Sequence, residues 1–212
     1  MRLRLLLFSA IFLILFTLFS YQVAKETFQR IDFDTMVKLQ DRTPQKYDEM
    51  LSFFSLLGSV EVTFGFCFIL ALMALFKGRW LVTLGWLMIL PATAAEVFGK
   101  LILFHPGPPY FFHRSELATT LPSFAVHTNF SYPSGHMTRI AFIATTLFIL
   151  ILLTKKNPWP KYLMIFMIIL IVGLMALSRI SLGEHWLSDV LGGILLGITV
   201  GLFASIFIVR RV

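Results

Sequence analysis

Residues Leu5–Ala24 read LLLFSAIFLILFTLFSYQVA, a stretch without one charged side chain. In a helix, about 20 apolar residues cross a hydrocarbon core about 30 Å thick. Arg2 and Arg4 precede the stretch, so a cleaved signal peptide is the alternative interpretation. However, the stretch exceeds the roughly 7 to 15 residues of a signal h-region, and Gln22-Val23-Ala24 is a poor small-x-small cleavage site. The pattern therefore favours an uncleaved membrane-spanning helix.

Five further stretches share this apolar character, and Glu61 is the only charged residue in the second span. We expect spans at about 5–24, 51–76, 81–104, 136–154, 162–179 and 188–209. The whole chain is 58% hydrophobic and 14% charged, with a mean hydropathy of +0.84, whereas soluble domains carry about a quarter charged residues. The sequence therefore predicts an all-α polytopic membrane protein with six transmembrane helices, which forms a single domain over residues 1–212.

The positive charges of the chain gather on one side of this arrangement. With six helices, both termini lie on one side, together with the turns that follow the second and fourth spans. That side carries no Asp or Glu, and its basic residues are Arg2, Arg4, Lys77, Arg79, Lys155, Lys156, Lys161, Arg210 and Arg211. By the positive-inside rule, we expect it to be the cytoplasmic face. The net charge of +7 is therefore interpreted as a topology signal, and nucleic acid is not an expected partner.

Two long connections lie on the opposite, outer side. Residues 27–50 mix apolar and charged side chains, which fits either an amphipathic segment on the membrane surface or a solvated loop. Residues 105–132 are rich in Pro and aromatic residues, and long loops of this kind often serve a binding site. We expect this second connection to form a lid or a lipid-facing wall.

Ionisable side chains at membrane depth are costly, about 2.5–3.5 kcal/mol each on insertion scales, so they mark functional sites. The outer ends of the last four spans bring together Lys100, His136, Arg179, His185 and Asp189. Lys and Arg converging on one point favour an anion with several oxygens. Pro133-Ser134-Gly135 opens the fourth span, where the backbone N–H groups of a first helical turn can face an anion. A phosphoryl group is the expected ligand.

His185 and Asp189 are four residues apart, so a helix places them on one face. A carboxylate on one ring nitrogen fixes the imidazole tautomer and leaves the other nitrogen to attack phosphorus. His136 can protonate the leaving oxygen and later accept a proton from water. Because the cations neutralise the phosphoryl oxygens, this chemistry requires neither metal nor cofactor.

Glu96 precedes Lys100 by four residues in the order that favours a helical ion pair, so we expect it to position that lysine. The remaining histidines could be considered as a zinc site. No pair among His105, His113 and His127 has the short spacing of zinc ligands, and no metal site is expected.

These residues resemble the type 2 phosphatidic acid phosphatases, or lipid phosphate phosphatases. The third signature of that family, Ser-Arg, five residues, His, three residues, Asp, is complete in Ser178-Arg179, His185 and Asp189. The second is complete in Pro133-Ser134-Gly135-His136. The first, Lys, six residues, Arg-Pro, keeps Lys100 and Pro108, but Gly107 stands where the family has Arg. Arg139 and Arg114 are the candidates to replace that cation.

The resemblance implies hydrolysis of a lipid phosphate through a phosphohistidine, with the lipid tails among the helices. His185, His136 and Asp189 would be catalytic, and the phosphate would be held by Lys100, Ser134, Gly135 and Arg179. The favoured substrate is phosphatidylglycerol phosphate, or else phosphatidic acid, and the alternative is undecaprenyl pyrophosphate. A lipid phosphotransferase would use the same residues. A transporter would instead require polar residues near the bilayer midplane. We expect a multi-pass protein of a bacterial cell membrane, with its site facing outside the cytoplasm.

Overall fold

The computed structural model describes residues 1–114, 130–154 and 158–209. These residues form helices and no β-strand, which confirms the predicted all-α class. The helices are α1 Arg2–Ala24, α2 Gln29–Arg42, η1 Gln45–Tyr47, α3 Asp48–Leu57, α4 Val60–Phe76, α5 Trp80–Leu87, α6 Ile89–Ile102, η2 Tyr110–Phe112, α7 Gly135–Leu153, α8 Pro158–Ser181 and α9 Leu187–Ile208. Within this part of the chain, six stretches are long and apolar enough to cross a membrane: Arg2–Ala24, Gln45–Phe76, Trp80–Ile102, Gly135–Leu153, Pro158–Ser181 and Leu187–Ile208.

Two of these stretches are not continuous helices, since Trp80–Ile102 comprises α5 and α6, and Gln45–Phe76 comprises η1, α3 and α4. Between α5 and α6 the cause is Pro91, because proline lacks an N–H and its ring clashes with the carbonyl four residues earlier, here that of Leu87. Between α3 and α4 the chain bends at Gly58, and the Ser59 hydroxyl starts α4 by accepting a hydrogen bond from the Val62 N–H at 3.3 Å. This second break frees the Gly58 carbonyl for a contact in the candidate site.

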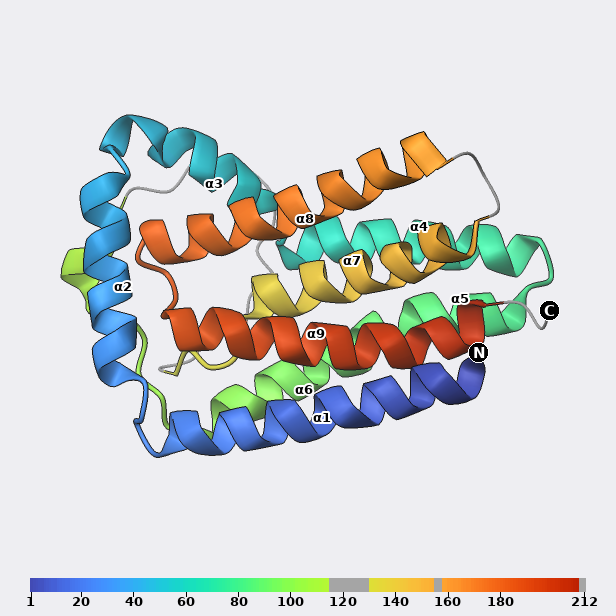
Figure 1. The fold of residues 1–212 in the computed structure, drawn as a ribbon, viewed down its shortest axis with the longest axis horizontal. Helices are drawn as coiled ribbons and strands as arrows, with labels where there is room; N and C mark the ends of the chain where they lie inside the picture. Colours follow the sequence, from blue (N-terminus) through green and yellow to red (C-terminus); the bar gives the residue numbers. More distant parts are fainter. Residues whose placement is uncertain (115–129, 155–157, 210–212) are drawn as a thin grey trace.

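The long helices run along one direction as a bundle, and α2 crosses one end of it (Figure 1). The start of α1 and the end of α9 meet at the other end, where the Arg2 guanidinium donates to the Val209 carbonyl at 3.2 Å. We call the end where α2 lies the distal end. On α2, Asp32 and Met36 are buried whereas Ile31 and Phe33 are exposed. Residues 29–42 therefore form a helix with one face packed on the bundle, and the alternative of a solvated loop does not hold for them.

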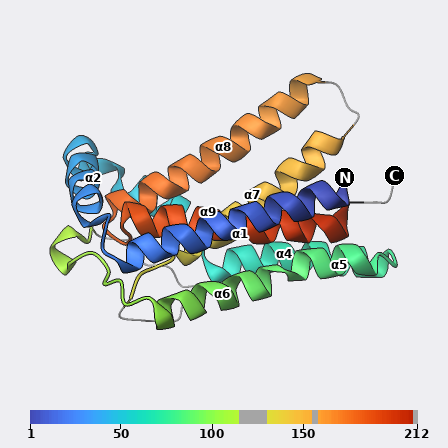
Figure 2. The ribbon, with the colours of Figure 1, turned by 60° about the horizontal axis from the view of Figure 1, so that its bottom comes forward.

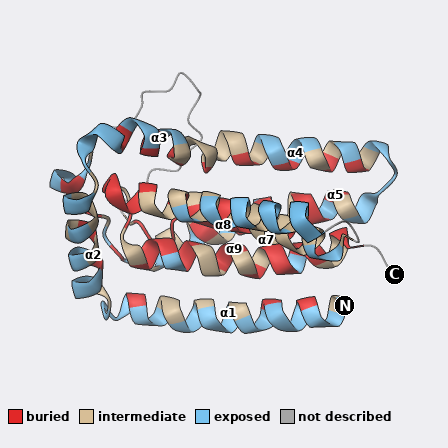
Figure 3. Cartoon of the chain, turned by 45° about the horizontal axis from the view of Figure 1, so that its top comes forward, coloured by how far each residue is buried: buried red, intermediate tan, exposed pale blue. Residues whose placement is uncertain are grey.

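Helix α9 lies at the centre of the bundle and carries buried residues along its whole length (Figure 3). A row of glycines brings it against α7. A Cβ built on Gly193 would lie 2.5 Å from the carbonyl oxygen of Ser134, and one on Gly197 would lie 2.5 Å from that of Thr138. Small residues spaced by four allow the backbones of membrane helices to touch in this way. The contact fixes the distal ends of α7 and α9 relative to each other.

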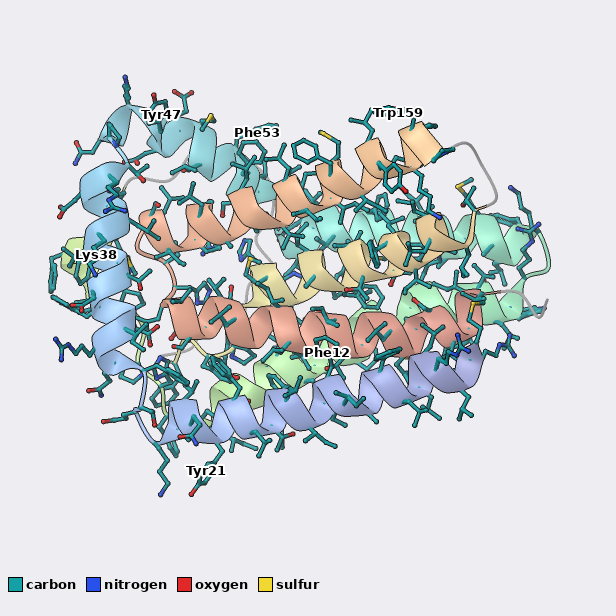
Figure 4. The ribbon with its side chains drawn as sticks, in the orientation of Figure 1. Phe12, Tyr21, Lys38, Tyr47, Phe53 and Trp159 are labelled. Carbon is teal, nitrogen blue, oxygen red and sulfur yellow. The ribbon has the colours of Figure 1, made fainter. Side chains whose placement is uncertain are left out.

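Helix α8 joins the bundle only near its distal end. Its buried residues are confined to Met175 and 178–181, and the rest of the helix diverges from α9 (Figure 2). The exposed Trp159 marks its far end, while Tyr21 and Tyr47 lie towards the distal end of the molecule (Figure 4). Tyr and Trp are enriched where membrane helices meet the two water interfaces. The surface therefore has the pattern of a multi-pass membrane protein.

Candidate active site

A tight turn brings the end of α8 back to the start of α9 at the distal end. Gly183 has a φ of +76°, and a Cβ there would overlap the carbonyl of Phe112, so only glycine fits. The turn is closed by the His185 N–H, which donates to the Arg179 carbonyl at 3.1 Å. As a result, the arginine of the last α8 turn and the histidine that precedes α9 lie side by side.

His185 and Asp189 form the expected pair. Nδ1 of His185 lies 3.2 Å from Oδ2 of Asp189, which is fully buried and also accepts the Trp186 N–H at 3.0 Å. The carboxylate thus orients the ring through Nδ1, and in a nucleophilic histidine Nε2 would then be the reactive nitrogen. Burial, and after it the nearby Arg179 cation, lowers the pKa of His185 well below its ordinary value. The imidazole is therefore held neutral, as a nucleophile requires.

His136 lies in the first turn of α7, opposite the bend between α3 and α4. A Cβ built on Gly58 would lie 3.1 Å from Cβ of His136, so the histidine packs directly on that bend. The charged and titratable groups that act on it electrostatically are Arg179, Arg139, His185 and Lys100. The structure therefore places both signature histidines within one cluster of cations.

The start of α7 has the features of an anion site. Ser134 is its N-cap and is completely buried, but its hydroxyl does not cap the helix and has no hydrogen-bond partner among the described residues. The Ser134 N–H donates to the Asp189 carbonyl at 3.0 Å, which fixes the turn against α9. The following N–H groups, from Gly135 to Met137, have no carbonyl within the helix to bond. A buried hydroxyl and a set of N–H donors at a helix N-terminus suit a phosphate.

Glu96 organises two of the cations. Its carboxylate contacts Nζ of Lys100 at 2.7 Å and Nη1 of Arg139 at 3.1 Å. Arg139 also donates from Nε and Nη2 to the Gly58 carbonyl, at 3.2 and 3.1 Å. A Cβ on Gly135 would lie 2.5 Å from a Glu96 carboxylate oxygen, so this glycine gives the glutamate its room. Glu96 thus pairs with Lys100, as the spacing predicted.

Arg179 has partners that sequence reasoning did not find. Its guanidinium donates to the Ser55 hydroxyl of α3 and to the Glu184 carboxylate, the latter at 3.2 Å. The neighbouring Ser178 hydroxyl donates to the Leu51 carbonyl of α3 at 2.7 Å. The only signal for these contacts in the sequence is that small polar residues interrupt the apolar second span. The site is therefore built from α3 as well as from the signature segments.

Comparison with known protein families identifies this arrangement. The sequence profile of the PAP2 superfamily matches residues 80–212. The chain belongs to the PAP2 superfamily. The match spans the three signature segments from Lys100 to Asp189, including Gly107 where the family has Arg. The match does not include α1 to α4. Two residues of that part nevertheless contact the site, since Ser55 accepts a hydrogen bond from the signature residue Arg179 and Gly58 accepts one from Arg139.

Two solved structures share the fold of this PAP2 chain. A transmembrane PAP2-type phosphatidylglycerolphosphate phosphatase from Bacillus subtilis has 19% identity and a TM-score of 0.72, over 92% of this chain and 93% of that one. LpxE from Aquifex aeolicus has 22% identity and a TM-score of 0.57, over 82% and 94% of the two chains. Among curated proteins, no sequence matches. The likeness extends the fold to almost the whole chain, including the part before residue 80.

Arg114 and Arg139, the candidates to replace the missing PAP2 arginine, already have other hydrogen-bond partners. Arg114 donates to the carbonyls of Thr43 and Gln40, each at 2.7 Å, and pairs with Asp48 at 3.2 Å. It therefore anchors the turn between α2 and α3, and its suggested role at the phosphate finds no support. Arg139 is buried and held by Gly58 and Glu96, so it supports Glu96.

His105 and His113, the described histidines outside the PAP2 signatures, have different surroundings. His127 lies outside the described residues. His113 is exposed and packs on Tyr110, whereas His105 is buried with Nε2 at 3.6 Å from Asp189. Within the described ranges, no group of three His, Cys, Asp or Glu residues could hold a metal ion. The position of His105 beside a predicted catalytic carboxylate was not expected from the sequence.

Proposed function

We propose that this PAP2 protein is a membrane lipid phosphatase that hydrolyses the phosphomonoester of a phospholipid through a phosphohistidine on His185. As a member of the superfamily, the chain is a phosphoric ester hydrolase. The observation that carries the finer proposal is the buried pair of His185 and Asp189 beside Lys100 and Arg179. A neutral imidazole that is oriented by a carboxylate and surrounded by cations suits nucleophilic attack on a phosphate.

In the first step, Nε2 of His185 attacks phosphorus and the bond to the lipid oxygen breaks. His136 gives its proton to that oxygen, so the lipid leaves as an alcohol. Asp189 stabilises the positive charge that develops on the ring of His185. In the second step, His136 takes a proton from water, the water oxygen attacks phosphorus, and the phosphorus–nitrogen bond breaks. Inorganic phosphate leaves and both histidines return to their starting states.

The phosphoryl oxygens are held by groups from three helices. The cations are Lys100 of α6 and Arg179 of α8, and the neutral donors are the Ser134 hydroxyl and the N–H groups that begin with Gly135 at the start of α7. Donors fixed in advance at a low-polarity site stabilise the charge of a transition state more strongly than water does. The buried Ser134 hydroxyl, which has no hydrogen-bond partner in the described part of the chain, supports this assignment in particular.

The substrate assignment favours phosphatidylglycerol phosphate, with phosphatidic acid as a second monoester. It is supported by the fold shared with the Bacillus subtilis enzyme, whose description names phosphatidylglycerolphosphate as substrate. Undecaprenyl pyrophosphate is the alternative, because its terminal phosphate would meet the same residues. A phosphotransferase differs only in using a lipid alcohol in place of water. The transporter interpretation is disfavoured, since the polar cluster lies at the distal end of the bundle.

The proposed location is a bacterial cell membrane, with both termini cytoplasmic and the active site on the outer side. The charges of the described chain support this orientation. Arg2, Lys77, Arg79 and Lys161 lie at turns or ends opposite to the distal end, where no described carboxylate accompanies them. The lipid substrate would then approach from the outer leaflet.

The test measures phosphate release by the detergent-purified protein, with EDTA present, from phosphatidylglycerol phosphate and from undecaprenyl pyrophosphate. His185→Ala is the blank, and His113→Ala is the matched control because that histidine is exposed. We expect release that His185→Ala abolishes and His113→Ala retains. The ratio of the two rates selects the substrate, and adding a lipid alcohol detects phosphotransfer. Turnover by pure His185→Ala protein would rule out the phosphohistidine.

A further inference from the structure

His105 lies beside the candidate catalytic machinery without belonging to a signature position. It is buried, with 8% of its surface exposed. Its Nε2 lies 3.6 Å from Oδ1 of Asp189 and 3.4 Å from the Ser188 hydroxyl. Histidines at such a depth have a partner for each polar atom in most proteins. Because Nε2 of His105 faces Oδ1 of Asp189 and the Ser188 hydroxyl, we expect the contact with Asp189 to have a role.

The two oxygens of Asp189 have different surroundings. Oδ2 faces His185 and accepts the Trp186 N–H, whereas Oδ1 is buried, faces His105 and accepts no hydrogen bond of ordinary geometry among the described residues, although the Ser131 hydroxyl also lies close enough to act on the carboxylate. A buried carboxylate oxygen without a donor is costly, and it lets the carboxylate rotate away from its other partners. His105 offers Oδ1 a ring N–H at a distance that a small movement would turn into a hydrogen bond.

The backbone around His105 is held on both sides. Its carbonyl accepts the Ser131 N–H at 2.9 Å, and the carbonyl of the next residue, Pro106, accepts the indole N–H of Trp186 at 2.9 Å. The ring also meets Tyr132 edge-on, with 6.3 Å between ring centroids. His105 is therefore built into the wall of the site, although it lies in a connection between helices.

A second carboxylate completes the arrangement. Asp32 of α2 accepts hydrogen bonds from both the N–H and the hydroxyl of Ser188, each at 2.7 Å. Ser188 in turn lies next to His105. Asp32 thus acts as a cap on the first turn of α9, supplied by another helix, and it holds Ser188 in place against the His105 ring. The chain of contacts runs from α2 through Ser188 and His105 to Asp189.

We propose that His105 is a positioning residue for the phosphoryl transfer, because it holds Asp189 in the orientation that aims His185 at phosphorus. This inference rests on the proposed function. With Oδ1 bound to His105, Oδ2 stays on Nδ1 of His185 throughout the formation and hydrolysis of the phosphohistidine. Outer partners that fix the orientation of a reactive histidine or carboxylate contribute strongly to activity in other sites.

The kinetic test compares His105→Ala, His105→Gln and the control His113→Ala. We expect His105→Ala to lower kcat about ten- to a hundredfold, as the loss of an outer partner does elsewhere, with little change in KM. His105→Gln should recover most of kcat, because its amide N–H can donate to Asp189 without a ring. His113→Ala should match the wild type. An unchanged kcat in His105→Ala, or a loss that His105→Gln does not recover, would overturn the proposal.

A second measurement does not depend on turnover. The protein has five histidines, so ¹⁵N-histidine NMR of the detergent-solubilised chain can follow His185, assigned by the signal that His185→Ala removes. We expect one fixed tautomer, protonated at Nδ1, in the wild type and in His105→Gln, and a mixture in His105→Ala. If the wild type releases no phosphate from any lipid, the proposed function fails, and the spectra alone decide the role of His105. The same tautomer in His105→Ala as in the wild type would refute that role.

Discussion

At the scale of single residues, the cations of the site already have carboxylate partners. Glu96 is buried and shared by Lys100 and Arg139, so it stays in place when a phosphate arrives. Glu184 is more exposed and lies on Arg179 at 3.2 Å, where a phosphate must compete with it. The two glutamates therefore have different roles: Glu96 orients a cation, and Glu184 occupies part of the proposed anion site.

The pKa of His185 leads to a prediction about pH. Because burial and Arg179 lower this pKa, the imidazole stays unprotonated below the ordinary histidine value of about 6.5. Activity is lost only as pH falls through the lowered pKa, so the acid limb of kcat/KM should lie below that value. Glu184 acts in the opposite direction and raises the pKa of His185. Glu184→Gln should therefore move the acid limb to lower pH, and a move to higher pH would contradict this electrostatic account.

Gly107, where the family has arginine, can accept a side chain. A Cβ there would meet only the Cβ of Ser131, at 3.6 Å, which is ordinary contact. We expect Gly107→Arg to fold normally and to keep or raise activity, with a KM lower by about fivefold if the new cation contributes about 1 kcal/mol. Gly107→Gln adds a long polar side chain without charge and is the control. A folded Gly107→Arg protein with a higher KM would show that the arginine cannot reach the phosphate.

At the scale of elements, the contact between α7 and α9 sets the geometry of the site. Gly197→Ala places a methyl group 2.5 Å from the Thr138 carbonyl, so the helices must separate. We expect a cost of about 1–3 kcal/mol in stability, and a lower kcat because Ser134 and Asp189 move apart. The measurement is the thermal unfolding temperature together with kcat.

Gly173→Ala is the matched control for this change. It lies on a single helix, α8, and has no neighbouring atom within 4 Å of a built Cβ. Alanine should stabilise that helix by up to about 1 kcal/mol and leave kcat unchanged. Equal effects of the two substitutions would show that helix propensity, and not the approach of α7 to α9, governs the result.

The elements also show what could be predicted from the sequence. The six apolar spans and the spacing of His185 and Asp189 depend on local pattern, and both were found there. The contact of Arg179 with Ser55, and that of His105 with Asp189, depend on how distant segments pack. No local periodicity encodes such packing. The sequence left the structure of residues 29–42 open, because the same amphipathic pattern fits a helix or a loop. The hydrogen bond from Ser188 to Asp32, which holds this helix against α9, depends on packing between distant segments.

At the scale of the whole molecule, the two ends of the bundle differ in chemistry. The distal end carries α2 and the candidate site, with acids and bases mixed, whereas the turn between α4 and α5 at the opposite end presents Lys77 and Arg79. Among the described residues, the second end has the excess of positive charge that the positive-inside rule associates with the cytoplasm. This asymmetry is the physical basis for the proposal that the site lies outside.

Cysteine labelling tests that orientation directly. Lys38 is exposed on α2 at the distal end (Figure 4), and Lys77 is exposed at the opposite end. The native Cys67 is fully buried, so the wild type should react little and serves as the blank. In intact bacterial cells, a membrane-impermeant maleimide should label Lys38→Cys, and it should label Lys77→Cys only after the membrane is opened. The reverse pattern would place the site on the cytoplasmic side, where it would act on lipids of the inner leaflet. This follows because, among the described residues, the proposed phosphate-binding groups lie at the distal end of the bundle alone.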